Sequence, residues 1–257
     1  MKSLLQYVTT SLLFFCVVLF SSCSFLKKES LVLPTPPAVT QIKSKPVHIE
    51  PTKAPITRVI EFDVDAQHTT GIIDLVMDPK GAALGLRKTR GTSPLEGTIK
   101  MQITEDPNTG KKEVFIQDMN LTNTHIYDMD FVWNALVGKI NMNIAPGVLE
   151  IIPNDFSSTG TLGGDKKFTL PDCYFTVLGH SRVKGSGLVL KKAVGDKQVN
   201  MTMQKTEPVN LQGTIEMNKG SAILRIPNAV LREQFDLDGT QLGLVFTEDI
   251  TATAQNL

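Results

Sequence analysis

The sequence predicts an all-β fold, an antiparallel sandwich or barrel with one or two short helices, in residues 58–257. Apolar and polar residues alternate there with a period of two, as expected for strands that bury one face. These runs recur roughly every 8 to 15 residues with turn-forming residues between them, a spacing typical of antiparallel β proteins. No strand–helix–strand rhythm and no glycine-rich phosphate loop interrupts the pattern.

The clearest strand pair is a hairpin between residues 97 and 116. Residues 97–103 alternate, residues 105–110 are rich in turn formers, and the strand pattern resumes at residues 113–116. Further strands are expected at residues 58–65, 71–77, 187–190, 199–203, 214–217, 222–226 and 242–247. About 235 residues remain after the signal, which suffices for one all-β domain or two small ones, and residues 58–257 are predicted to be a single all-β domain.

Helix is expected in two places only. Residues 131–137 are long enough for one or two helical turns. Asn228 is a residue type that caps helix N-termini, so a short helix is expected from there through Gln234, ending before the turn at residues 236–239.

The N-terminus has the composition of a secretion signal. Lys2 precedes an apolar run at residues 12–20, which has the length of a signal-peptide core. The run is shorter than the roughly 20 apolar residues that a transmembrane helix needs. Ser21 and Ser22 then lead into Cys23. This arrangement resembles the lipobox of bacterial lipoproteins, although Phe20 stands where that family usually has leucine.

The resemblance implies that residues 1–22 are a signal peptide, cleaved before Cys23, and that Cys23 carries the lipid. Several acyl chains would anchor the protein stably to a membrane of the cell envelope. Because Ser24 follows the cysteine, the sorting rule of enteric-type lipoproteins favours the outer membrane. The alternatives are an ordinary secretion signal and a retained membrane anchor.

Residues 23–57 are predicted to be a lipidated, proline-rich flexible tether. Proline fixes φ and has no N–H, so such a stretch favours extended conformations without a core. The prolines lie at Pro34, Pro36, Pro37, Pro46, Pro51 and Pro55.

Composition narrows the possible functions. Lys plus Arg and Asp plus Glu both number 26, so no net field attracts nucleic acid. The chain has a single tryptophan, which argues against a platform for stacking bases or sugars. Cys173 is the one cysteine outside residues 1–23 and lies in a strand-like run, so it is expected to be a buried apolar residue rather than a reactive thiol.

Two clusters of Asp and His are candidate metal ligands. Their patterns, Asp-x-Asp-x-x-His and His-x-x-Asp-x-Asp, mirror each other in sequence. If they met in space, their oxygen and nitrogen donors could bind a divalent ion, which would permit a metal-dependent enzyme. The alternative is that these residues are solvated strand and turn positions. The cluster residues are Asp63, Asp65, His68, His125, Asp128 and Asp130.

Catalytic sequence motifs are absent, and no cofactor is expected. Residues 87–90 are interpreted as a small basic loop, for which simple solvation is favoured over contact with anionic lipid or glycan. Residues 62–70 are similar to the Asp-x-x-His-Ser opening of YceI-like lipid-binding barrels, with Thr69 in place of serine. That resemblance implies a barrel that carries an isoprenoid-like chain.

The leading interpretation is therefore a lipid-anchored envelope protein that is not an enzyme, with a binding or structural role. Its partners would be the membrane, through the anchor, and an envelope protein or an apolar ligand. A carrier of an apolar ligand and a metal-dependent enzyme are the alternatives.

Overall fold

The computed structural model describes residues 52–78, 84–155, 158–202, 206–237 and 240–257. The predicted signal peptide, Cys23 and the tether up to residue 51 lie outside the described residues. The chain divides into two units, Met1–Ile49 and Glu50–Leu257, and the second unit is a compact domain with its own core.

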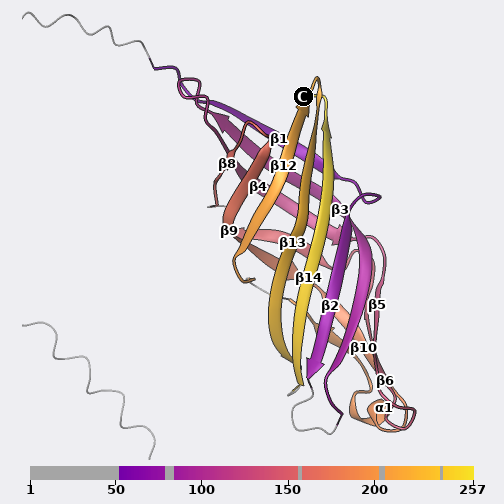
Figure 1. The fold of residues 1–257 in the computed structure, drawn as a ribbon. Helices are drawn as coiled ribbons and strands as arrows, with labels where there is room; N and C mark the ends of the chain where they lie inside the picture. Colours follow the sequence, from indigo (N-terminus) through magenta and orange to yellow (C-terminus); the bar gives the residue numbers. More distant parts are fainter. Residues whose placement is uncertain (1–51, 79–83, 156–157, 203–205, 238–239) are drawn as a thin grey trace, which may run out of the picture. The chain divides into compact units, whose positions relative to one another are not determined.

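The described elements are fourteen strands and one short helix (Figure 1). They are β1 (Ile56–Val64), β2 (Thr70–Asp78), β3 (Arg87–Glu105), β4 (Lys112–Asn123), β5 (Tyr127–Val132), β6 (Lys139–Ile144), β7 (Glu150–Asp155), β8 (Gly160–Leu162), β9 (Lys167–Leu178), β10 (His180–Ser186), α1 (Leu190–Ala193), β11 (Asp196–Asn200), β12 (Val209–Asn218), β13 (Ser221–Leu237) and β14 (Thr240–Gln255).

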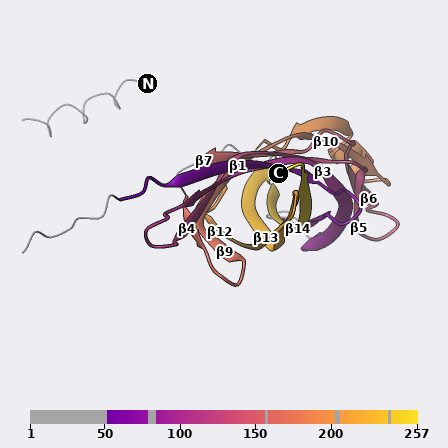
Figure 2. The same cartoon turned by 90° about the horizontal axis from the view of Figure 1, so that it is seen from above.

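Eight of the strands close into an antiparallel barrel. The circuit runs β3-β2-β14-β13-β12-β9-β7-β4 and returns to β3. β1 continues the line of β2 along the same edge of β3 and also pairs with β14 through Asp63 and Val64. Seen from above, the strands form a ring around the core (Figure 2). Of the two expected architectures, the structure therefore has the barrel.

A second sheet of four strands, in the order β11-β10-β6-β5, extends one end of the barrel. β5 follows β4, β6 precedes β7 and β10 follows β9, so neighbours in one sheet continue as neighbours in the other. The inner face of β5 is joined to the barrel through Tyr127, whose ring meets Phe246 edge-on at 6.5 Å between centroids. Both ends thus share one core.

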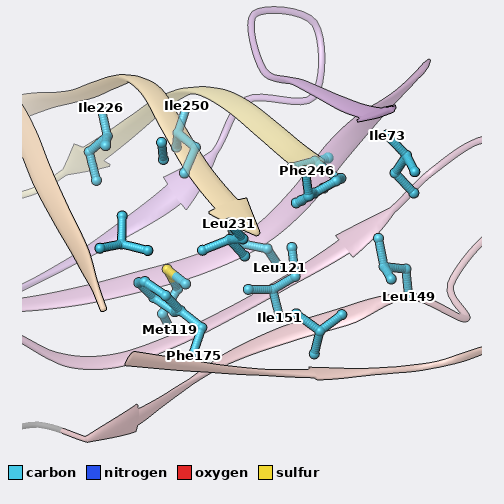
Figure 3. Packing of buried hydrophobic residues seen from close by; sticks show 14 of the residues in the cluster. Ile73, Met119, Leu121, Leu149, Ile151, Phe175, Ile226, Leu231, Phe246 and Ile250 are labelled. Atoms are coloured by element: carbon cyan, nitrogen blue, oxygen red, sulfur yellow. The ribbon is translucent and has the colours of Figure 1, made fainter. Parts of the chain in front are cut away.

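The core follows from the period of two along the long strands. In β14 every second residue points inward and is buried. Each fully buried large apolar side chain contributes about 1.5–3 kcal/mol, so the long strands carry most of the stability. Figure 3 shows Ile226 and Ile250 on one side of the interior facing Met119 and Phe175 on the other.

Gly97 marks a close approach between β3 and β4. Its φ is +138°, and a Cβ there would lie 1.9 Å from the carbonyl oxygen of Asn120 on β4. Only glycine fits such a position, because any side chain would collide with backbone that cannot yield.

Both predicted helices are wrong. Residues 131–132 end β5 and residues 133–138 form a turn, closed by the bond from the Trp133 N–H to the Gly138 carbonyl oxygen. The segment from Asn228 to Gln234 lies in β13 and pairs with β14, because Ala229 and Leu231 are buried with the spacing of a strand. The one described helix, α1, lies elsewhere.

Cys173 and the basic residues 87–90 both lie in strands. Cys173 lies in β9 and is buried, as expected. Residues 87–90, expected to be a loop, are instead the start of β3, where Arg90 forms two hydrogen bonds of 2.7 and 2.8 Å with Asp74. Among the described residues no helix is long and apolar enough to cross a membrane.

Candidate functional site

The barrel wall opens where β12 and β13 separate. The two strands pair only between residues 214–218 and 221–225. Beyond that point the register of β13 against β14 shifts, at Pro227, which has no N–H, and Asn228, which has a positive φ of 52°. The Asn228 N–H donates to the carboxylate of Asp249 at 2.8 Å, which holds the bulge against β14.

The separation leaves a groove of about 540 Å³, here called the wall groove. This volume lies within the range of roughly 300–1,000 Å³ that is usual for ligand sites. Its apolar floor consists of Phe168, Pro227 and Ile250, and its remaining lining is polar or charged. The polar and small lining residues are Lys167, Thr169, Gln212, Gly213, Thr214, Arg225, Asp249 and Thr251.

Gly213 allows the Phe168 ring to form part of the groove floor. A Cβ at this position would lie 2.7 Å from the Phe168 ring and 2.5 Å from the carbonyl oxygen of Arg225. Because glycine has no side chain, the Phe168 ring can lie directly beneath the wall. A larger residue would push the ring aside and alter the groove.

The charged groups of the wall groove are already engaged with neighbours. Arg225 donates to Glu216 at 3.0 Å, and Asp249 accepts the Asn228 N–H. The ammonium of Lys167 lies 3.7 Å from Asp165. Groups held in this way suit recognition better than proton transfer, because acid–base catalysis needs a group free to take up or release a proton at the substrate.

A buried carboxyl group lies on the inner side of the same wall. Glu248 is 3% exposed, and its Oε1 has no hydrogen-bond partner. The space beside it is only about 10 Å³ and is bounded by apolar side chains. These side chains are Met119, Ile151, Phe175, Leu211, Ile226, Ala229, Leu231 and Ile250.

Burial raises the pKa of the Glu248 carboxyl to about 8, because the apolar surroundings disfavour its charged form. Across the ladders it lies opposite Ala229 and Gly71. The Tyr127 hydroxyl donates to the Gly71 carbonyl oxygen at 3.2 Å, and its pKa is raised by burial and then by the charge of Glu248. Near neutral pH the Glu248 side chain is therefore mainly a neutral acid.

The interior beside Glu248 has room for about one water molecule. An isoprenoid-like chain would need many times this space. This part of the interior therefore gives no support to the expectation of an apolar-ligand carrier, while the wall groove lies on the outer side of the barrel.

The first predicted metal cluster has no metal-binding geometry. Asp63 lies in β1 opposite Thr98 and Thr253, whereas Asp65 lies beyond the end of β1. The His68 ring and the Asp65 carboxylate are hydrogen-bonded at 2.6 Å. That bond is the main cause of the lowered pKa of Asp65.

The residues of the second cluster are hydrogen-bonded to neighbouring side chains. His125 Nδ1 bonds with the Thr124 hydroxyl at 2.8 Å, and Asp128 accepts hydrogen bonds from two asparagine side chains on β6. Asp130 is bound by Lys139 at 2.7 Å, which lowers its pKa. Across the described ranges no three His, Cys, Asp or Glu side chains are grouped to hold a metal ion, so the predicted metal site is not assembled.

Glu248 was not among the sequence-predicted site residues, although the sequence contains a signal for it. Residues 242, 244, 246, 250, 252 and 254 of β14 are apolar and point inward. Glu248 occupies the same phase, so an acid at an inward position of an alternating strand was visible in the pattern.

No family model matches this chain, and no curated protein matches it. Among solved structures, two crystal structures of Ail, the attachment invasion locus protein of Yersinia pestis, are similar, one of them in complex with the heparin analogue sucrose octasulfate. Each is 9% identical and covers 75% of this chain and 98% of the Ail chain, with TM-scores of 0.30 and 0.28. At these TM-scores the similarity supports no conclusion about function.

Proposed function

We propose that this protein is a lipid-anchored protein of the bacterial cell envelope, at the outer membrane, and that it binds a partner rather than catalysing a reaction. Cys23 carries the anchor, and the proline-rich residues 24–57 connect it to the barrel domain. Support for the anchor comes from the apolar run and the small residues before Cys23.

The wall groove carries the binding part of the proposal. It is the large recess described above, with an apolar floor and charges of both signs along its sides. Small-molecule and peptide sites combine an apolar surface with a few fixed polar groups in this way. Beside Glu248, by contrast, the interior has room for only about one water molecule.

An extended segment of an envelope protein is the partner that fits the groove. On the edge of β13 turned away from β14, no strand among the described residues pairs with residues 229–237. An unpaired strand edge is a template for an added strand, and the adjacent groove provides room for its side chains.

The anchor is tested by replacing Cys23 with alanine in the full chain and separating membrane from soluble fractions of the native envelope. The wild-type protein is expected in the membrane fraction and to incorporate labelled fatty acid. The C23A variant is expected to lose the label. An unchanged label and fractionation would refute lipidation at Cys23.

The groove is tested by placing a photoreactive amino acid at Gln212, inside it, and at Arg58, an exposed position outside it on β1. Cross-linking in the intact envelope is expected from Gln212 and not from Arg58. A second substitution, Thr251→Tyr, fills the groove and is expected to remove the cross-link. Equal cross-linking from both positions, or no effect of the tyrosine, would contradict binding in the groove.

A further inference from the structure

One end of the domain carries a group of exposed apolar side chains, here called the loop end. It is formed by residues 84–88 before and at the start of β3, by residues 132–139 between β5 and β6, and by residues 186–192 between β10 and α1. Five large apolar side chains there are between 45% and 75% exposed. They are Leu86, Val132, Leu136, Leu188 and Val189.

The loop end is held together by specific contacts. The Trp133 indole N–H donates to the Leu84 carbonyl oxygen at 2.8 Å, and the Arg87 guanidinium lies 5.5 Å from the centre of the same ring. Arg87 also donates to the Val132 carbonyl oxygen at 3.0 Å. The Leu190 N–H donates to the Val137 carbonyl oxygen at 3.2 Å, which attaches α1 to the β5–β6 turn. These contacts fix the three segments to one another, so the exposed apolar side chains have defined positions.

Basic side chains lie in the same segments as the apolar group. Lys191 and Lys192 lie in the last turn of α1, both exposed, and Lys88 is exposed at the start of β3. Asp130, the acid of β5 in this region, is already bound to Lys139. Cations thus lie beside apolar side chains at this end.

The loop end lies far along the barrel from the first strand. β1 begins opposite Glu105, beside the turn between β3 and β4, whereas the loop end lies at the opposite end of β3 (Figure 1). A surface at that end is free to meet something other than the start of β1.

We propose that the loop end is a docking surface for an anionic lipid bilayer. Leu136 and Leu188 enter the interfacial region, Trp133 lies at the level of the headgroups, and the lysines bind lipid phosphates. Apolar side chains with basic residues around them and a tryptophan at the boundary are the features by which peripheral proteins hold to membranes. This inference goes beyond the wall groove and does not depend on it.

A lipid surface fits these side chains better than a protein partner. Protein–protein interfaces are depleted in lysine, which loses much of its hydration and side-chain freedom when buried. At a lipid surface lysine keeps its ammonium in water and gains attraction from anionic headgroups. Leu136, Leu188 and Val189 lie on turns and Val132 ends β5, so these apolar side chains come from the tips of the strands, which matches a soft planar surface.

Trp133 makes the proposal directly measurable, because it is the single tryptophan of the chain. The chain from Ser24 onward contains the whole compact domain without the signal peptide or the acylated cysteine. This protein is mixed with vesicles of phosphatidylcholine, or of equal parts phosphatidylcholine and phosphatidylglycerol. Blue-shifted Trp133 emission and quenching by brominated lipid are expected with the anionic vesicles, and the binding should weaken as salt is added.

Variants separate the contributions. Leu188→Ser, at the most exposed apolar residue, is expected to lower vesicle partitioning about tenfold. Lys191→Gln and Lys192→Gln are each expected to lower it about fivefold. Val59→Ser, on exposed β1 at 49% exposure, is the matched control and should leave partitioning unchanged. Circular dichroism verifies that each variant is folded.

Three outcomes would overturn the proposal. The first is unchanged Trp133 emission with anionic vesicles. The second is equal binding by the wild type and by Leu188→Ser. The third is a photoreactive residue at Leu188 that cross-links in the native envelope to a protein and not to lipid, which would assign the loop end to a protein partner. None of these outcomes would affect the Cys23 or wall-groove tests.

Discussion

Replacing Glu248 with glutamine should make the domain more stable at neutral pH. The carboxyl group is buried without a partner for Oε1, and its pKa is raised from 4.5 to about 8. In the unfolded chain the same group has an ordinary pKa and loses its proton readily. Folding therefore retains a proton that the unfolded state would release.

This retained proton means that the folded domain loses stability as the pH rises. Well below pH 4.5 the group is protonated in both states, so it adds no pH-dependent term to the free energy of unfolding. As the pH rises from 4.5 toward 8, the native state is penalised by about 1.4 kcal/mol per pH unit, which is about 3 kcal/mol near pH 7. This value is an upper limit, because a water molecule in the adjacent space would solvate the carboxylate. Glutamine has nearly the same shape and carries no charge, so E248Q escapes the penalty.

Urea unfolding followed by circular dichroism, at about pH 5 and about pH 8, measures the difference. The wild type should lose stability between these two pH values relative to E248Q. Glu61→Gln, an exposed acid on β1, is the control and should follow the wild type at both. If the wild type and E248Q changed in parallel with pH, the carboxyl group would be hydrated in the folded protein and the reasoning would be refuted.

Two further changes test the packing. Gly97→Ala places a Cβ 1.9 Å from the Asn120 carbonyl oxygen, at a φ of +138°. Its free energy of unfolding, measured from the urea midpoint, should therefore fall by roughly 2–3 kcal/mol or more. Gly110→Ala is the control: a Cβ there meets open space, so its free energy of unfolding should fall by only about 1 kcal/mol. The Cys173 thiol is buried, and burial raises its pKa, so it should react slowly with an alkylating reagent in native buffer and rapidly in urea; fast native labelling would contradict its burial.

Several strands, such as β1, β2 and β14, were predictable because their signal is local. The strand expected at residues 187–190 was wrong, because these residues form a turn and the start of α1, and β5, β6, β7 and β10 were not predicted. The alternation at residues 97–103 and 113–116 indicates a hairpin, and β3 and β4 pair there. Closure of the ring was not predictable, because it depends on pairing between residues 70–78 and 241–249 at opposite ends of the domain. The choice between a sandwich and a barrel depends on that contact.

The predicted helix after Asn228 was wrong for an instructive reason. Asn228 is a good cap by residue type, but here it takes a positive φ in a bulge, which asparagine also tolerates. The buried positions of Ala229 and Leu231 then follow the strand period. Tertiary pairing with β14 decided the local structure.

One candidate site is recognisable from local sequence, and the other depends on the fold. Glu248 is recognisable from the sequence, because it is an acid at an inward position of the alternating strand β14. The loop end is not, because its turns lie near residues 86, 136 and 188, and only the fold brings them together. The Asp and His clusters resemble each other in sequence, yet their side chains bond with immediate neighbours.

Ring closure also constrains how the domain folds. The last strand, β14, must pair with β2 and β1 at the beginning of the domain before the ring is complete. Until residues 240–255 are available, β13 and β2 each present an open edge that can pair with another chain. A nascent domain emerging from its N-terminus is therefore exposed to aggregation until its last strand arrives, and a chaperone that covers strand edges would act during that interval.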